Sequence, residues 1–205
     1  LMGITSIIRG DDHINNTPRQ ILIYEALNYR MPEFAHVPLI HGKDKGRLSK
    51  RHGATSLLEY RNDGFLPEAL MNYLARLGWA YGDQEVFAKQ DLIEKFDLKN
   101  VGKSPSIFDM DKLLWLNGHY LKTLPEVEVA TRLESFLENR GIKVTDRAKL
   151  IPVVINLRDR AKTLKEMAEM AAFFFTDDFP YDENAKNKFL TASTKPILER
   201  FLNEF

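Results

Sequence analysis

The sequence predicts an α/β segment followed by an all-α segment, so that the chain is mostly helical overall. Strand and helix patterns alternate over residues 1–60, and from Gly64 onward the spacing of apolar residues is helical. Residues 124–205 show no alternating strand pattern. We therefore divide the chain into an α/β piece at 1–60, a helical connector at 61–123 and an all-helical unit at 124–205.

The α/β piece opens with a short apolar run. Residues 4–9 are rich in β-branched side chains and predict a strand that ends at Gly10. A helix is predicted over residues 17–28, with Thr17 as its N-cap and Gln20 completing a capping box. A strand followed by a helix is typical of an α/β unit.

A second extended piece and a second capped helix complete the α/β piece. Residues 36–42 predict the extended piece, and residues 56–64 predict a helix with a capping box from Ser56 to Glu59. Apolar periodicity predicts helices in the rest of the chain at residues 66–78, 89–96, 109–121, 125–141, 148–175 and 194–205.

Composition excludes several classes of protein. Lys plus Arg and Asp plus Glu both number 29, so a polyanionic partner would have to be met by a local basic patch. Without cysteine the chain forms no disulfide and no thiolate metal site, which suits a cytoplasmic protein. No apolar run approaches the ~18–20 residues of a membrane span, so no membrane partner is expected. Residues 1–10 resemble the middle of a strand, and we interpret the chain as a fragment of a longer protein.

The stretch from Gly42 to Gly53 concentrates positive charge on a segment that cannot pack. Five of its residues are Lys or Arg, and three are glycines. Glycine lets the backbone approach a ligand closely and lysine suits phosphate, so the stretch could clamp a polyphosphate. A solvated surface loop is the alternative, because basic loops are common. The order of its residues does not match a Walker A motif.

Polar residues also cluster where the first predicted strand ends. The carboxyl end of a strand is the edge at which α/β sheets place their ligands. Four polar residues stand there: Arg9, Asp11, Asp12 and His13. Their spacing is equally consistent with a ligand site and with an ordinary polar turn. No further ligand is spaced nearby, so no metal site is predicted.

Four blocks of the sequence, taken together, are a more specific signal than any one motif. They are IIRGDDHINNTPRQILIYEAL, HVPLIHGKDKGRLSKRHGATSL, GFLPEALMNYLARLGW and FDMDKLLWLNGHYL. In this order and spacing they resemble the bacterial glutamyl-tRNA synthetases, a family of class I aminoacyl-tRNA synthetases, from residue 4 to about residue 122 and more loosely to the end. The stretch from Arg47 to Arg51 resembles the family's KMSKS loop, with Arg47 in place of the first lysine.

The resemblance implies a fold and a reaction. The fold is the C-terminal part of a Rossmann-like catalytic domain, a helical stem-contact segment and the first part of a helical anticodon-binding domain. The reaction is activation of glutamate, whose carboxylate attacks the α-phosphate of ATP in line, followed by transfer to tRNA(Glu). Mg²⁺ would accompany ATP, and the family expectation is a cytoplasmic monomer.

The resemblance also assigns residues to roles. Lys50 is the catalytic candidate, because an ammonium brought to the phosphates stabilises charge that grows in the transition state. Arg9 is the candidate for binding the glutamate substrate, since an anionic amino acid needs a bidentate cation. His36 is either on the adenine side of the pocket or a packed core histidine. The ATP-binding candidates are Arg47, Leu48, Ser49, Lys50, Arg51, Asp12 and His13.

In the helical part the resemblance implies contacts with tRNA. Arg160 aligns with an arginine that reads the third base of the anticodon, and Arg158 is a second candidate. A solvated, charged helix end is the alternative for both. We expect Trp79 to be packed in the core, and likewise the run from Phe173 to Phe175, because three consecutive aromatic side chains cannot all face one ligand.

Two other functions remain open. A glutaminyl-tRNA synthetase shares much of the catalytic core, but its anticodon region is a β-barrel, whereas residues 124–205 are predicted to be helical. A non-catalytic tRNA-binding module could use the basic stretch and the arginines of the helical part. The HIGH motif of class I enzymes is absent from the sequence, so we expect this chain alone to be catalytically incompetent.

Overall fold

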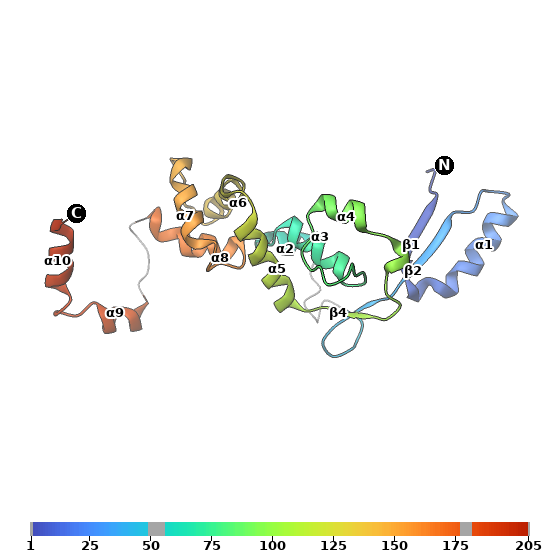
Figure 1. Ribbon diagram of the computed structural model, residues 1–205, viewed down its shortest axis with the longest axis horizontal. Helices are drawn as coiled ribbons and strands as arrows, with labels where there is room; N and C mark the ends of the chain where they lie inside the picture. Colours follow the sequence, from blue (N-terminus) through green and yellow to red (C-terminus); the bar gives the residue numbers. More distant parts are fainter. Residues whose placement is uncertain (1, 49–55, 177–181, 205) are drawn as a thin grey trace.

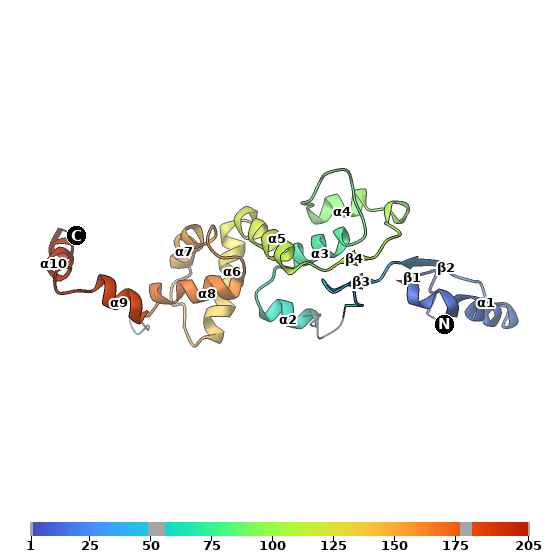
Figure 2. The ribbon, with the colours of Figure 1, turned by 90° about the horizontal axis from the view of Figure 1, so that it is seen from below.

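The computed structural model describes residues 2–48, 56–176 and 182–204. Its elements are spread along a long axis, with the two chain ends toward opposite sides (Figure 1). The N-terminal strands lie at one end, and the last two helices extend away from the rest at the other (Figure 1 and Figure 2). Within the described ranges, no helix has the length and apolar character needed to cross a bilayer.

The α/β piece is a parallel strand–helix–strand unit. Its two strands pair so that Arg9 lies opposite His36, and a 3₁₀ helix and an α-helix connect them. Pro38 has no N–H to donate, and the extended piece predicted at 36–42 is interrupted there. The elements are β1 (Ser6–Gly10), η1 (Asp11–Asn16), α1 (Thr17–Ala26), β2 (Glu33–Val37) and β3 (Ile40–His41).

Both predicted capping boxes are wrong. The N-cap of α1 is Asn16, whose side chain makes no capping hydrogen bond. Thr17 is the first helical residue, and its hydroxyl bonds to side chains outside the helix, which makes it unavailable as a cap. Ser56 does occupy the N-cap of α2 (Leu57–Asn62), but its side chain makes no capping hydrogen bond either.

The connector supplies helices and a short strand that returns to the α/β piece. This strand, β4, pairs in parallel with β3, and the Phe108 N–H donates to the His41 carbonyl oxygen at 2.8 Å. The returning segment therefore runs beside the end of the α/β piece. After α2, the connector elements are α3 (Pro67–Arg76), α4 (Lys89–Lys95), η3 (Leu98–Asn100), β4 (Ser106–Ile107) and α5 (Met110–Thr123).

The all-helical unit departs from the prediction at two places, because it contains a helix at Glu183–Phe189 that was not predicted and because one predicted helix is divided. The single helix predicted over 148–175 is broken at 158–163, because the Thr163 hydroxyl accepts a hydrogen bond from the Glu166 N–H (3.1 Å) and caps a new helix. Glu166 in return accepts from the Lys162 N–H at 2.8 Å. The elements are α6 (Glu126–Asn139), η4 (Arg147–Lys149), α7 (Leu150–Leu157), α8 (Leu164–Ala171), η5 (Ala172–Phe174), α9 (Glu183–Phe189) and α10 (Lys195–Glu204).

One apolar core runs through both the connector and the all-helical unit. Its fully buried members include Leu66, Leu113 and Leu133. Asn117 bridges the two parts inside this main core: its Oδ1 accepts from the Leu66 N–H at 2.7 Å, and its amide donates to the Lys162 carbonyl oxygen at 2.6 Å. The two parts are thus packed against each other, and the division at residue 124 stays a prediction.

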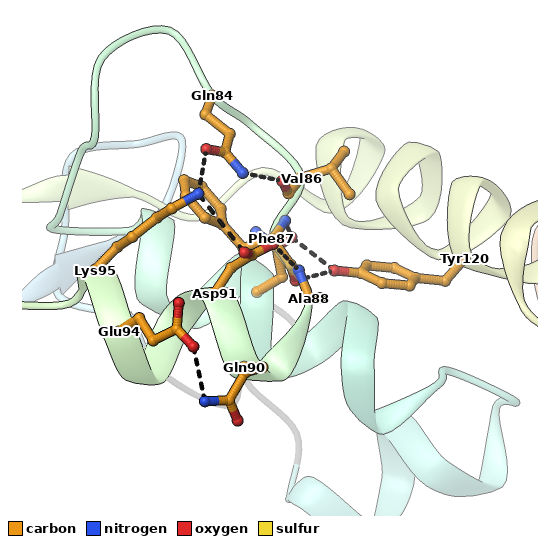
Figure 3. Close-up of polar contacts among 10 residues, drawn as sticks. Gln84, Val86, Phe87, Ala88, Gln90, Asp91, Glu94, Lys95 and Tyr120 are labelled. Carbon is orange, nitrogen blue, oxygen red and sulfur yellow. Dashed lines mark hydrogen bonds and ion pairs between the residues drawn. The ribbon is translucent and has the colours of Figure 1, made fainter.

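A second, smaller core forms beside α4. Trp79 is only 2% exposed and packs with Phe87 and Leu92, which confirms its predicted core position. Figure 3 shows Tyr120 reaching from α5 to the Phe87 carbonyl oxygen, at a distance of 2.7 Å. Burial raises the pKa of the Tyr120 phenol to about 12. Lys95 of α4 lies over the Phe87 ring, with Nζ 5.8 Å from its centroid, so Phe87 is contacted from both α4 and α5.

Candidate functional site

The carboxyl end of the paired strands holds a hydrogen-bonded group of side chains around Arg9. Arg9 Nη2 donates to the Thr17 hydroxyl at 2.8 Å, and Arg9 Nε donates to His36 Nε2 at 3.4 Å. The Thr17 hydroxyl lies 2.9 Å from the same His36 nitrogen. The guanidinium also lies over the Phe34 ring, 5.3 Å from its centroid. We call Arg9, Thr17, Phe34 and His36 the Arg9 cluster.

Arg9 is held by neutral groups. Its contacts are a hydroxyl, an imidazole and an aromatic ring, and no carboxylate of the described residues pairs with it. A half-buried cation without a counter-charge is suited to bind a carboxylate from outside. His36 is partly buried and hydrogen-bonded to polar side chains, so the core-histidine alternative is wrong.

Helix η1 places the predicted ATP-side residues next to the Arg9 cluster. The Asp12 carboxylate folds back over Gly10, where an added Cβ would lie 2.6 Å from Asp12 Oδ1. Asp12 Oδ2 pairs with Arg47 Nη1 at 3.2 Å. His13 is exposed, and its Nδ1 lies 3.1 Å from Asn16 Nδ2. The polar residues after β1 therefore form a turn whose side chains lie beside the Arg9 cluster, and their role in ligand binding stays a prediction.

The described part of the basic stretch is a tight turn. The Gly42 N–H donates to the Gly46 carbonyl oxygen at 2.9 Å, and the Gly46 N–H donates to Asp44 Oδ1 at 2.9 Å. Arg47 then returns beside β3 and reaches Asp12. Two sequence blocks that are far apart in the chain meet at this ion pair. An exposed ion pair of this kind contributes at most about 1 kcal/mol to folding stability. Its importance is that it brings the two sequence blocks together.

Lys43 and Leu48 attach this turn to the connector. Lys43 Nζ lies 3.3 Å from an Asp111 carboxylate oxygen and 3.5 Å from one of Asp109. The hydrogen bond to Asp111 raises the pKa of Lys43. Leu48 is partly buried against the main core. The remaining predicted residues of the loop lie outside the described residues, and these are Ser49, Lys50 and Arg51.

A hollow of about 340 Å³ adjoins the Arg9 cluster at the end of β2. His36 and Asp11 line it from the α/β piece, while Lys99 and Lys103 line it from the connector. No motif surrounds these two lysines, so the sequence alone does not mark them as site residues. The pairing of β4 with β3 brings their segment to this edge, and no short-range pattern predicts that pairing.

The donor set at this edge suits phosphate better than a bare metal ion. Arg47, Lys99 and Lys103 are exposed cations around the carboxyl ends of the strands. Within residues 2–48, 56–176 and 182–204, no three carboxylate or imidazole groups converge as metal ligands. Lysine and arginine bind phosphate oxygens directly, so a nucleotide polyphosphate fits the residues that are present.

The two predicted RNA-contacting arginines have different surroundings. Arg158 Nη1 donates to Glu126 Oε1 at 2.8 Å, which joins the end of α7 to the start of α6. Arg160 is exposed and lines a hollow of about 440 Å³. Phe173 and Phe174 line the same hollow and are 52% and 44% exposed, with ring centroids 4.1 Å apart. The predicted core position is therefore wrong for these two phenylalanines.

The direction of the chain explains their exposure. Helix α8 ends at Ala171, and η5 then turns the chain. As a result Phe175 packs against the main core, whereas Phe173 and Phe174 do not. A cation beside exposed aromatic rings can bind an unstacked nucleobase by hydrogen bonding and stacking. The hollow at Arg160 is thus a candidate contact for single-stranded RNA.

Comparison with known families identifies the class of this protein. A model of the catalytic domain of class I tRNA synthetases (E and Q) matches residues 1–115, and a model of an anticodon binding domain matches residues 128–205. The first match covers more than half of the chain. The chain therefore belongs to the class I tRNA synthetase family for glutamate and glutamine, and it combines part of the catalytic domain with a helical anticodon-binding region.

Relatives narrow the family further. A glutamate–tRNA ligase from Geotalea uraniireducens is 57% identical over 204 residues, covering 100% of this chain and 44% of the relative. The glutamate–tRNA ligase of Geobacter sulfurreducens is 56% identical and covers 96% of this chain and 42% of the relative. A solved glutamate tRNA ligase from Elizabethkingia meningosepticum, in complex with its amino acid, matches with a TM-score of 0.77 and 31% identity, covering 99% of this chain and 44% of that one. The chain thus spans less than half of these relatives.

Proposed function

We propose that this chain is the part of an ATP-dependent glutamate–tRNA ligase that carries the KMSKS-type loop. The observation that carries the proposal is the meeting of two sequence blocks at the ends of β1 and β2. There the Asp12–Arg47 ion pair lies next to Arg9, a cation that no described carboxylate neutralises. A site for an anionic amino acid beside a site for a polyphosphate is what glutamate activation needs. The glutamate–tRNA ligases among the relatives support the same reaction.

The residues then take distinct parts in the reaction. Arg9 binds a carboxylate of the glutamate substrate, while the α-carboxylate attacks the α-phosphate of ATP and pyrophosphate leaves. Negative charge grows on the phosphate oxygens, and Lys50 stabilises it more in the transition state than in the ground state. The other ATP-binding residues are Arg47, Leu48, Ser49, Arg51, Asp12 and His13. Mg²⁺ would arrive bound to ATP and neutralise part of its charge.

The second step transfers the glutamyl group to tRNA(Glu), and the helical part of the chain contacts this tRNA. The terminal ribose hydroxyl of tRNA(Glu) takes the glutamyl group and AMP leaves. Arg160 would read an anticodon base at the hollow that Phe173 and Phe174 share, with Arg158 fixing the turn through its ion pair with Glu126. On this proposal residues 1–60 complete the catalytic domain, 61–123 form the stem-contact connector and 124–205 begin the anticodon-binding domain.

On this proposal, the ligase activity requires a protein as long as the glutamate–tRNA ligases among the relatives. The chain covers 44% of the Geotalea uraniireducens ligase and has no HIGH motif, so the 205-residue chain alone would not make glutamyl-adenylate. We further propose that the full-length protein is a cytoplasmic monomer. A glutaminyl-tRNA ligase is disfavoured, because its β-barrel anticodon region has no counterpart in the described helices of residues 126–174.

Lys50→Ala in the full-length protein tests the proposal. An electrostatic contact to the transition state is commonly worth ~2–4 kcal/mol, so glutamate-dependent ATP–pyrophosphate exchange should fall about 10²–10³-fold. Lys188→Ala on α9 is the matched control and should leave exchange unchanged. Exchange by the Lys50 variant within a few-fold of wild type would refute the role of Lys50. A wild-type protein that binds tRNA without any glutamate-dependent exchange would instead indicate a non-catalytic RNA-binding module.

A further inference from the structure

We propose that Thr17 and His36 are positioning residues that hold the Arg9 guanidinium in the orientation that binds the substrate carboxylate. The inference rests on the proposed role of Arg9 in glutamate binding. Neither residue was assigned a role with the substrate carboxylate from the sequence, where Thr17 had the pattern of an ordinary helix cap. The hydrogen bonds of the Arg9 cluster carry the argument.

The bonds within the cluster occupy one edge of the guanidinium. Arginine has five N–H donors arranged as a planar fork. Nε donates to His36 and one N–H of Nη2 donates to Thr17, so the side-on edge is bound to the protein. Both N–H groups of Nη1 and the second N–H of Nη2 remain. One N–H of Nη1 and the second N–H of Nη2 form the end-on fork of Arg9, which matches the two oxygens of a carboxylate.

The hydrogen bonds also indicate which ring nitrogen of His36 carries the proton. Arg9 Nε can only donate, so His36 Nε2 must be the unprotonated acceptor and the imidazole proton must be on Nδ1. The Thr17 hydroxyl accepts from Arg9 and directs its own proton toward His36 Nε2 at 2.9 Å or the His13 carbonyl oxygen at 3.3 Å. Every bond of Arg9 in the cluster therefore runs from the cation to a neutral acceptor.

Two elements, β2 and α1, hold the groups that contact Arg9 in place. His36 lies opposite Arg9 in the register of β1 and β2, and Thr17 is the first residue of α1. The Phe34 ring, also on β2, lies under the guanidinium and restricts its tilt. A side chain held by three other side chains loses little further freedom when it binds a ligand, which increases affinity.

The cluster leaves the charge of Arg9 available. Asp12, a carboxylate three positions along from Arg9, pairs with Arg47 instead. An arginine that served only stability would be expected to pair with such a carboxylate, because an uncompensated half-buried cation is costly. Neutral acceptors orient the guanidinium without cancelling its charge, and this is the property that a substrate-binding cation requires.

Thr17→Val in the full-length protein tests the inference, because valine keeps the shape and removes the hydroxyl. A hydrogen bond to a charged group is worth ~1.5–3 kcal/mol, so the KM for glutamate should rise about tenfold or more. The KM for ATP should stay within about twofold, and Thr17→Ser should restore the wild-type value. Thr131→Val is the matched control, since the Thr131 hydroxyl bonds only within α6, to the Val127 carbonyl oxygen at 2.8 Å.

The outcomes separate this inference from the proposed function. A wild-type protein without glutamate-dependent exchange would overturn the proposed function. An active wild type with an unchanged glutamate KM in Thr17→Val would overturn the inference alone, and so would equal increases in the KM for glutamate and for ATP. If Thr17→Val does not fold, His36→Phe removes the second acceptor and should likewise raise the KM for glutamate about tenfold or more. Failure of both variants to fold would contradict a positioning role, because the cluster would then be a requirement for folding.

Discussion

Replacing Gly64 by alanine tests the contact between the connector and the all-helical unit. Gly64 has φ +84°, a left-handed conformation that costs an alanine ~1–2 kcal/mol. An added Cβ would lie 2.5 Å from the Lys165 backbone nitrogen and 2.7 Å from that of Leu164. Because both atoms are backbone, no side-chain rotation relieves the clash. The Leu164 N–H to Gly64 carbonyl hydrogen bond, 3.0 Å long, would be lost at a further cost of about 1–3 kcal/mol.

The total expected destabilisation of Gly64→Ala is about 2–5 kcal/mol, which corresponds to a fall in Tm of about 4–20 °C for a chain of this size. Gly141→Ala is the matched control: Gly141 has φ +77°, and an added Cβ meets nothing within 4 Å. It should lose only the ~1–2 kcal/mol of the backbone strain. Circular dichroism at rising temperature measures both variants. Equal losses in the two would refute the reasoning that α8 packs against this turn.

Two further predictions concern pH and RNA. Arg132 holds the pKa of Glu68 below its usual value by hydrogen bonding, so the stabilisation from Glu68 is complete above the unfolded-state pKa and is lost as pH falls through the lowered folded-state pKa. Urea unfolding should therefore show Glu68→Gln clearly less stable than wild type at about pH 6, and this difference should shrink progressively as the pH falls below the unfolded-state pKa; a pH-independent difference would contradict this. In the full-length protein, Arg160→Ala should weaken discrimination at one anticodon base by about 1–3 kcal/mol, measured by charging of tRNA with substituted anticodons. Arg200→Ala, an exposed arginine on α10, should have no effect, and equal behaviour of the two variants would exclude Arg160 as a base reader.

Much of the fold could be predicted because it is local. Residues 4–9 and the amphipathic helices carry their burial pattern in short windows, and the observed elements follow them. Strand β4 has two residues and pairs with a segment more than sixty positions earlier in the chain, so no window reveals it. The break at 158–163 did have a local signal, since Thr163 and Glu166 have the spacing of a capping box. Apolar periodicity on both sides concealed that signal.

The site was predictable only where a motif marks it. The polar residues after β1 and the basic stretch were identified from residue type, and the Asp12–Arg47 ion pair brings them together. Thr17 was missed because a threonine before a helix has the pattern of a cap, and only the tertiary fold shows that Arg9 and His36 take its hydroxyl. Lys99 has no motif around it. The pairing of β4 with β3 brings its segment to the site, and this pairing also appears only in the tertiary fold.

Charging of tRNA by the full-length protein tests the central claim most directly. With ATP, Mg²⁺ and tRNA(Glu), we predict that the wild type attaches radiolabelled glutamate to the tRNA and does not attach glutamine. The Lys50→Ala variant should lose this activity about 10²–10³-fold while it still binds the tRNA. Attachment of glutamine in place of glutamate, or binding of tRNA with no attachment of either amino acid, would contradict the account.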